Sequence, residues 1–189
     1  MAKLVIYEDE RAANFLPISY TRPVYDVKCG PLTLREKAEM GIEHDSEALF
    51  CRRYLAEAMR ERTGLPVNDE GALEGEVVLV NGRAVISSEV ARKVAELEPG
   101  RALVNEKGEL VAAKVPDGRK LGWLAEADPP PADAWRETGL EPVETEALVL
   151  EYLWQIPVLL EEGEVIADDI ERISEGKRRG APDDKVVVY

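Results

Sequence analysis

Two polar runs in this sequence contain the residue types that bind phosphorylated ligands. A run at 8–11 (EDER), which includes Asp9 and Arg11, follows the apolar segment 3–7, and Asn81 and Arg83 follow the apolar segment 77–80. An arginine fork matches phosphate oxygens, and an asparagine amide can bind a base edge or a sugar hydroxyl. A carboxylate beside them suits a magnesium ion that bridges to phosphate. The two runs therefore predict an anion-binding site.

These side chains meet only if the two apolar segments are neighbouring strands of one sheet. Ligands collect beyond the carboxyl ends of strands in open α/β sheets. In that case Arg11, Arg83 and the nearby Arg22 converge on one crevice with Asn81. Two alternatives stay open: each arginine is a solvated surface group, or Asp9 is a turn acid at the end of its strand.

The elements alternate in the way that an α/β fold requires. Strands are expected at 3–7, 47–51 and 77–80, and helices at 52–63 and after Ser88, which we expect to cap its helix. Another helix begins at Thr33, because Thr33 and Glu36 fit a capping box. This order predicts an α/β domain with a mostly parallel sheet between layers of helices, plus a small β-hairpin insertion at 101–115.

The segment 11–31 is a long connection without periodicity. It contains three prolines and a glycine, yet also many apolar residues, so we expect it to pack onto the domain. Near the other end, Ile166, Ile170 and Ile173 predict one face of a last helix. A polar linker at 175–180 and a strand at 185–189 would follow it. We therefore expect one domain over 1–175, and a linker with the start of a further domain over 176–189.

Composition and charge exclude several classes of protein. The 189 residues include 45% hydrophobic and 33% charged residues, which suits a folded domain with a sizeable core. The net charge of −14 argues against nucleic-acid binding. No apolar stretch is long enough to cross a bilayer, and the N-terminus has no targeting signal, so we expect a cytoplasmic protein. Residues 1–35 escape the acidic trend, with five cationic and four acidic side chains.

Metal and nucleophile chemistry has few candidates here. Cys29 and Cys51 lack CxxC spacing, and His44 is the single histidine. A zinc site of the usual kind has too few ligands. We expect reduced thiols in the packing, with a disulfide between the two cysteines left open as an alternative.

One long motif resembles a known family. The run from Phe15 to Lys37, FLPISYTRPVYDVKCGPLTLREK, is similar to the opening of sugar nucleotidyltransferases that resemble the uridyltransferase half of bifunctional N-acetylglucosamine-1-phosphate uridyltransferase. The runs 80–83 (VNGR) and 151–154 (EYLW) fit the same pattern, so the resemblance covers nearly the whole chain.

The resemblance implies a nucleotidyltransferase-like (Rossmann-like) α/β fold of three layers. It implies transfer of a nucleotidyl group from a nucleoside triphosphate to a sugar 1-phosphate, with release of pyrophosphate and with Mg²⁺ as cofactor. Relatives commonly continue into a left-handed β-helix with acyltransferase character, so a homo-oligomer is expected for a longer form. Carried over by position, the catalytic candidates are Arg11, Arg22 and Lys28, and the substrate-binding candidates are Asp9, Thr21, Asn81, Gly82 and Arg83.

Three positions depart from the family pattern. The loop 8–14 lacks the glycines that let backbone amides approach phosphates. Val24 follows Pro23 where a lysine is usual, and Arg83 stands where a metal-binding aspartate is expected. These departures keep an alternative open, in which the chain is a catalytically degenerate module that binds ligands or positions an attached acyltransferase β-helix.

Overall fold

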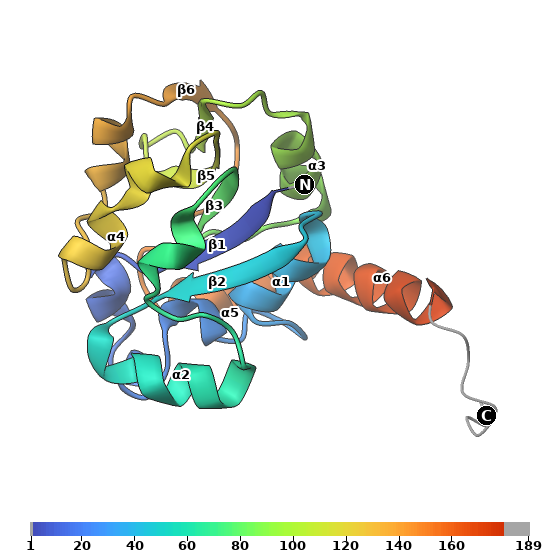
Figure 1. Cartoon of the computed structure of the whole chain (residues 1–189). Helices are drawn as coiled ribbons and strands as arrows, with labels where there is room; N and C mark the ends of the chain where they lie inside the picture. The colour runs from blue at the N-terminus through green and yellow to red at the C-terminus, as the bar shows by residue number, and fades with distance from the viewer. Residues whose placement is uncertain (1, 180–189) are drawn as a thin grey trace.

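The computed structural model describes residues 2–179, and the side chains of residues 2–175 within that range. Its described strands form one mixed sheet in the order β2-β1-β3-β5-β4-β6 (Figure 1). β1 pairs in parallel with β2 and β3, β5 runs antiparallel to β3 and β4, and β6 is parallel to β4. The strands are β1 (Lys3–Tyr7), β2 (Ser46–Phe50), β3 (Val77–Asn81), β4 (Arg101–Val104), β5 (Leu110–Val115) and β6 (Glu141–Glu144).

Helices cover both faces of this sheet, as an α/β fold of three layers requires. Alternate residues of β1 point to opposite faces: Leu4 and Ile6 pack against α1, α2 and α3, whereas Val5 and Tyr7 pack against α4 and the turns around it. The helices are α1 (Leu34–Gly41), α2 (Ala56–Thr63), α3 (Ser88–Glu96), α4 (Trp123–Glu126), α5 (Gln155–Glu161) and α6 (Glu164–Arg179). The predicted fold class is confirmed.

Local signals explain where several elements begin and end. The capping box expected at α1 is present, because the Thr33 hydroxyl accepts from Glu36 and the Glu36 carboxylate accepts from Thr33. α2 ends at Gly64, whose positive φ of 70° is costly for other residues. The prediction of Ser88 as a cap was wrong by one position: Ser87 is the N-cap of α3 and accepts from the amide of Val90. The hairpin β4–β5 forms and continues the main sheet beside β3.

The long connection between β1 and α1 is packed down, as its apolar content predicts. The connection forms three short 3-10 helices, at 10–15, 18–20 and 24–26. Phe15, Val24 and Val27 are buried, and they pack with Leu150 and Ile156 from the other end of the chain. This third apolar cluster fixes the loop that carries Arg11, Arg22 and Lys28.

The last helix differs from its prediction in both face and length. Ile170 is 54% exposed, Ile166 and Ile173 are half-buried, and Asp169 and Arg172 are buried, so the isoleucines form only part of the inner face. Asp169 and Arg172 face the body of the protein because each has a buried partner there: Asp169 pairs with Lys37, and Arg172 donates to the carbonyl of Ile86. α6 also continues to Arg179, through residues where a linker was expected. The strand expected at 185–189 lies outside the described residues.

Both cysteines are free and buried, as expected for thiols in the packing. Burial raises the pKa of Cys29 to about 11 and that of Cys51 to about 12, which keeps both thiols protonated at neutral pH. Within the described part of the chain, no helix is long and apolar enough to cross a membrane.

Candidate functional site

The sheet brings the two predicted polar runs together. Tyr7 at the end of β1 is the register partner of Asn81 at the end of β3, so the residues that follow them are neighbours. The Arg83 guanidinium donates to both oxygens of Asp9, with Nε–Oδ1 at 2.9 Å and Nη2–Oδ2 at 2.8 Å. Asn81 donates to the same carboxylate at 3.3 Å. Asp9, Asn81 and Arg83 thus form one cluster, as the sequence predicts.

Arg83 lies inside this cluster and is closed off from solvent. Its exposed fraction is 0%, and it also donates to the carbonyl of Leu150 at 2.6 Å and to Glu109 at 3.4 Å. Burial alone would lower the pKa of Arg83, but the hydrogen bonds and charge of Asp9 outweigh it and raise the pKa. Arg83 is therefore a permanent internal cation whose charge Asp9 and Glu109 balance.

Gly82 supports this cluster through the backbone. Its amide donates to the carbonyl of Tyr7 at 2.7 Å. A Cβ atom at this position would lie 2.7 Å from the same oxygen and 2.9 Å from the ring of Tyr25. The glycine is needed for close approach of two strand ends, and Arg83 then turns back over Asp9.

The acidic side chains of this cluster do not fit a resident Mg²⁺ ion. Both oxygens of Asp9 already accept hydrogen bonds, from Arg83, Asn81 and the amide of Arg11. Glu109 likewise accepts from Arg11, Arg83 and Asn105. In the described residues, no group of three His, Cys, Asp or Glu side chains is arranged to hold a metal. The cation at this strand end is a guanidinium.

Sequence reasoning missed a second buried pair beside the first. Glu8 is 0% exposed and accepts from the amide of Val24 at 3.0 Å and from Arg52 Nε at 2.8 Å. Arg52 also donates to the carbonyls of Ser19 and Arg22, so it ties the end of β2 to the long loop. The position of Glu8 directly after a buried strand could have predicted a functional or structural acid there, but no local pattern marks Arg52 as its partner.

Arg22 and Lys28 lie on a different surface, in a groove of about 570 Å³ between the loop 14–28 and the segment 153–157. Arg11 and Arg83 do not line this groove, so the expected single crevice for three arginines was wrong. The Arg22 side chain has no hydrogen bond or ion pair with any described residue. Lys28 donates to the carbonyl of Pro31 at 2.8 Å, and Thr21 is exposed beside Arg22.

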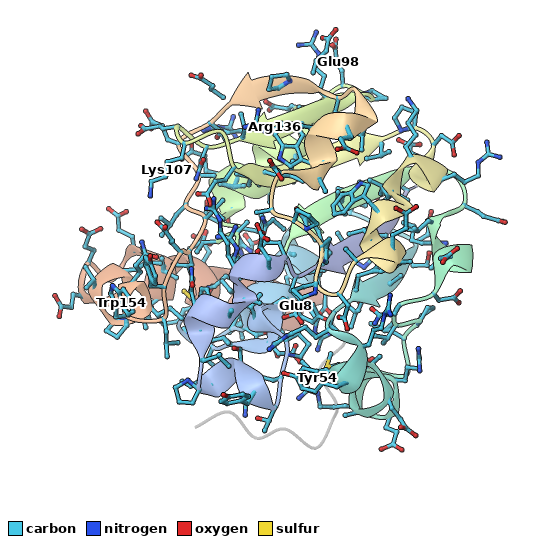
Figure 2. All side chains as sticks on the ribbon, turned by 90° about the vertical axis from the view of Figure 1, so that its left-hand side faces the viewer. Glu8, Tyr54, Glu98, Lys107, Arg136 and Trp154 are labelled. Carbon is cyan, nitrogen blue, oxygen red and sulfur yellow. The ribbon has the colours of Figure 1, made fainter. Side chains whose placement is uncertain are left out.

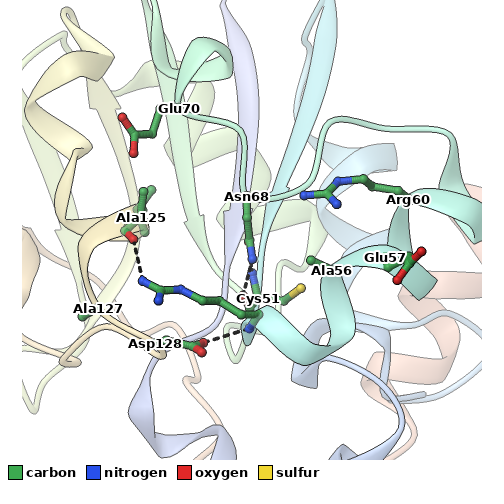
Figure 3. Close-up of a pocket in the computed structure, with 11 residues that line it drawn as sticks. Cys51, Ala56, Glu57, Arg60, Asn68, Glu70, Ala125, Ala127 and Asp128 are labelled. Carbon is green, nitrogen blue, oxygen red and sulfur yellow. Dashed lines mark hydrogen bonds between the residues drawn. The ribbon is translucent and has the colours of Figure 1, made fainter.

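A second hollow, of about 400 Å³, opens at the carboxyl end of β2 (Figure 3). It lies between α2 and the segment 124–128, and its walls include Cys51, Asn68 and Asp128. The cationic side chains here are already bound: Arg53 donates to the carbonyl of Ala125 at 3.2 Å, and Arg60 to that of Val67 at 2.7 Å. Arg22 is therefore the more available phosphate donor.

Comparisons with known proteins agree with this architecture. A family model described as "Sugar nucleotidyl transferase" matches residues 4–178. A solved structure titled as a glucose-1-phosphate thymidylyltransferase from Bacillus anthracis, in complex with a sucrose, is similar with a TM-score of 0.51 and 10% sequence identity. The match covers 84% of this chain and 95% of that chain, and at this identity it shows the fold. A search of curated proteins found no match.

Proposed function

The chain belongs to the sugar nucleotidyl transferase family, and on that basis we propose that it transfers a nucleotidyl group from a nucleoside triphosphate to a sugar 1-phosphate. In this reaction an oxygen of the sugar phosphate attacks the α-phosphorus, and pyrophosphate leaves. The protein has to align two polyanions and balance the charge that develops during an in-line displacement.

The observation that carries the proposal is the free guanidinium of Arg22. Arg22 is exposed, lacks a partner among the described residues and shares its groove with Lys28. A guanidinium in this state can receive phosphate oxygens without first breaking an ion pair. We assign Arg22 and Lys28 to the phosphates of the substrates, with the Thr21 hydroxyl as a further donor.

The buried cluster would take a different part in the reaction. Arg11 is bound to Glu109 but its side chain is 40% exposed, so it can still present part of its guanidinium to a ligand. Asp9, Asn81, Gly82 and Arg83 are assigned as positioning residues. The side chains of Asp9, Asn81 and Arg83 bind one another, Asp9 also accepts from the amide of Arg11, and Gly82 donates to the carbonyl of Tyr7.

Mg²⁺ enters the proposal only as the ion that accompanies a triphosphate in solution. Such an ion commonly keeps several waters and binds the phosphates with one or two carboxylates. The carboxylates of Asp9 and Glu109 already accept hydrogen bonds from side chains of the protein, so we derive no step from a resident metal.

The experiment is an assay of pyrophosphate release with a panel of nucleoside triphosphates and sugar 1-phosphates. Arg22→Ala should lower the rate about 100-fold or more, the loss seen when one donor to a developing charge is removed. Arg92→Ala is the matched control, because Arg92 is an exposed arginine on α3 that pairs with Glu96 of the same helix. An Arg22→Ala protein with the unaltered rate would contradict the assignment, and nucleotide binding without any pyrophosphate release would favour the binding-module alternative.

A further inference from the structure

A recess beside the groove collects positive charge in an otherwise acidic protein. It measures about 240 Å³, and the side chains around it include four cations, Arg22, Lys28, Arg35 and Arg62, but only two carboxylates, Asp26 and Glu36. The chain as a whole has a net charge of −14. This local excess of positive charge makes the recess suitable for an anion.

The two carboxylates do not use up these cations. Arg35 and Arg62 both contact Asp26, Arg35 also pairs with Glu39 outside the recess, and Lys28 lies 3.5 Å from Glu36. Arg22 again has no such partner in the described part of the chain. Arg22 and Lys28 line both the recess and the groove, so one ligand could place an anionic group in the recess and the rest of its structure in the groove.

The groove itself is mainly apolar. Leu16, Ile18, Val27 and Ile156 line it, and Asn14 is the uncharged polar side chain among its lining residues. A ring with many hydroxyl groups would lose its hydrogen bonds to water in such a groove and find few replacements. The groove therefore favours a flat apolar body over a sugar ring.

One side chain in the groove is suited to stacking. Trp154 is 64% exposed, and it lies at the edge of the molecule on the segment that leads into α5 (Figure 2). Its ring is stacked on that of Tyr152, with centroids 4.2 Å apart and planes at 10°. This contact holds the indole in one orientation while most of its surface stays open to solvent. Exposed aromatic rings of this kind bind bases by stacking.

We propose that the groove and recess together bind the nucleotide, with its base against Trp154 and its phosphates at Arg22 and Lys28. This inference rests on the proposed function, since it decides which of the two substrates occupies the groove. Stacking uses the π-face that all bases share, and the lining has few groups that could read base edges. The site should thus accept several bases and bind purines, with their larger rings, more tightly than pyrimidines.

Isothermal titration with ATP, UTP, tripolyphosphate and glucose 1-phosphate tests the assignment. Trp154→Ala should weaken ATP binding about tenfold or more, whereas Trp154→Phe should retain most of the affinity. Trp154→Ala should leave tripolyphosphate binding unchanged, and Arg22→Ala should weaken both ligands. Tyr54→Ala is the control, because Tyr54 is an aromatic residue of similar exposure, at 60%, that lies outside the lining of the groove and recess.

Three results would overturn the inference: no nucleotide binding by the unaltered protein, equal ATP affinity in Trp154→Ala, or an equal loss for glucose 1-phosphate and ATP in that variant. The pyrophosphate assay separates this failure from failure of the proposed function. Trp154-dependent ATP binding without pyrophosphate release refutes transfer and leaves the nucleotide site standing. Pyrophosphate release that does not depend on Trp154 refutes the nucleotide site and leaves transfer standing.

Discussion

Asp9 and Arg83 show how strongly a single position can depend on a partner 74 residues away. Both side chains are fully buried, so each charge has left water: Arg83 balances the charge of Asp9, and Asp9 and Glu109 balance the charge of Arg83. Removing one member of a buried pair leaves an uncompensated charge, which is far more costly than the net value of the pair itself.

Arg83→Met should therefore lower the free energy of unfolding by about 3–5 kcal/mol, measured by urea denaturation. The double variant Asp9→Asn/Arg83→Met should lose less than the two single variants together, because the stranded carboxylate is gone. Arg119→Met is the control, since Arg119 pairs with Asp117 on the exposed surface and should leave the midpoint unchanged. Equal losses for Arg83→Met and Arg119→Met would refute the structural role of the buried pair.

At the scale of elements, the turn after β3 depends on the close approach of two strand ends. Gly82→Ala should destabilise the protein by about 1–3 kcal/mol, because the added methyl group overlaps the Tyr7 carbonyl oxygen and the Tyr25 ring. Gly122→Ala is the matched control: Gly122 has φ of −52°, and an added Cβ would meet only ordinary contacts at 3.7 and 3.9 Å. Thermal melts of both variants measure the difference, and equal melting temperatures would contradict this account of Gly82.

The sequence predicts elements well where local signals agree with packing. The runs 4–7 and 77–80 are continuous and apolar, and both lie in central strands where these residues are buried on two faces. The capping box at Thr33 also forms, because its donors and acceptors lie within one turn. These features needed no knowledge of distant residues.

The features that the sequence could not predict depend on contacts between residues far apart in the chain. Ile170 fits an apolar stripe by spacing, yet it is exposed because Asp169 and Arg172 find buried partners on other elements. Arg83 has the chemistry of a phosphate ligand, and only the position of Asp9 shows that its donors are already used. The groove with Arg22 and Trp154 likewise joins two segments far apart in the chain.

At the scale of the whole molecule, α6 fastens separate parts of the chain to one another. Asp169 contacts the Lys37 ammonium in α1 and accepts from the amide of Leu32 at 3.2 Å. Arg172 donates to the carbonyl of Ile86 at 2.8 Å and to the Ser88 hydroxyl at 2.9 Å. The helix extends from the body of the protein in Figure 1, but its buried charges bind the connection before α1 and the start of α3.

Asp169→Asn should consequently destabilise the segments that Asp169 contacts as well as α6 itself. The Lys37 ammonium, whose side chain is 2% exposed, would stay buried without a counter-charge, and stability should fall by about 3–5 kcal/mol. Because Asp169 also holds Leu32, amide exchange at 28–37 should accelerate more than exchange in β1 and β3, which lie in the centre of the sheet. Glu171→Gln, an exposed neighbour on the same helix, should change neither quantity. Uniform acceleration across the molecule would show that α6 adds to global stability alone, whereas acceleration confined to 28–37 would show that it holds in place the loop on which Lys28 lies.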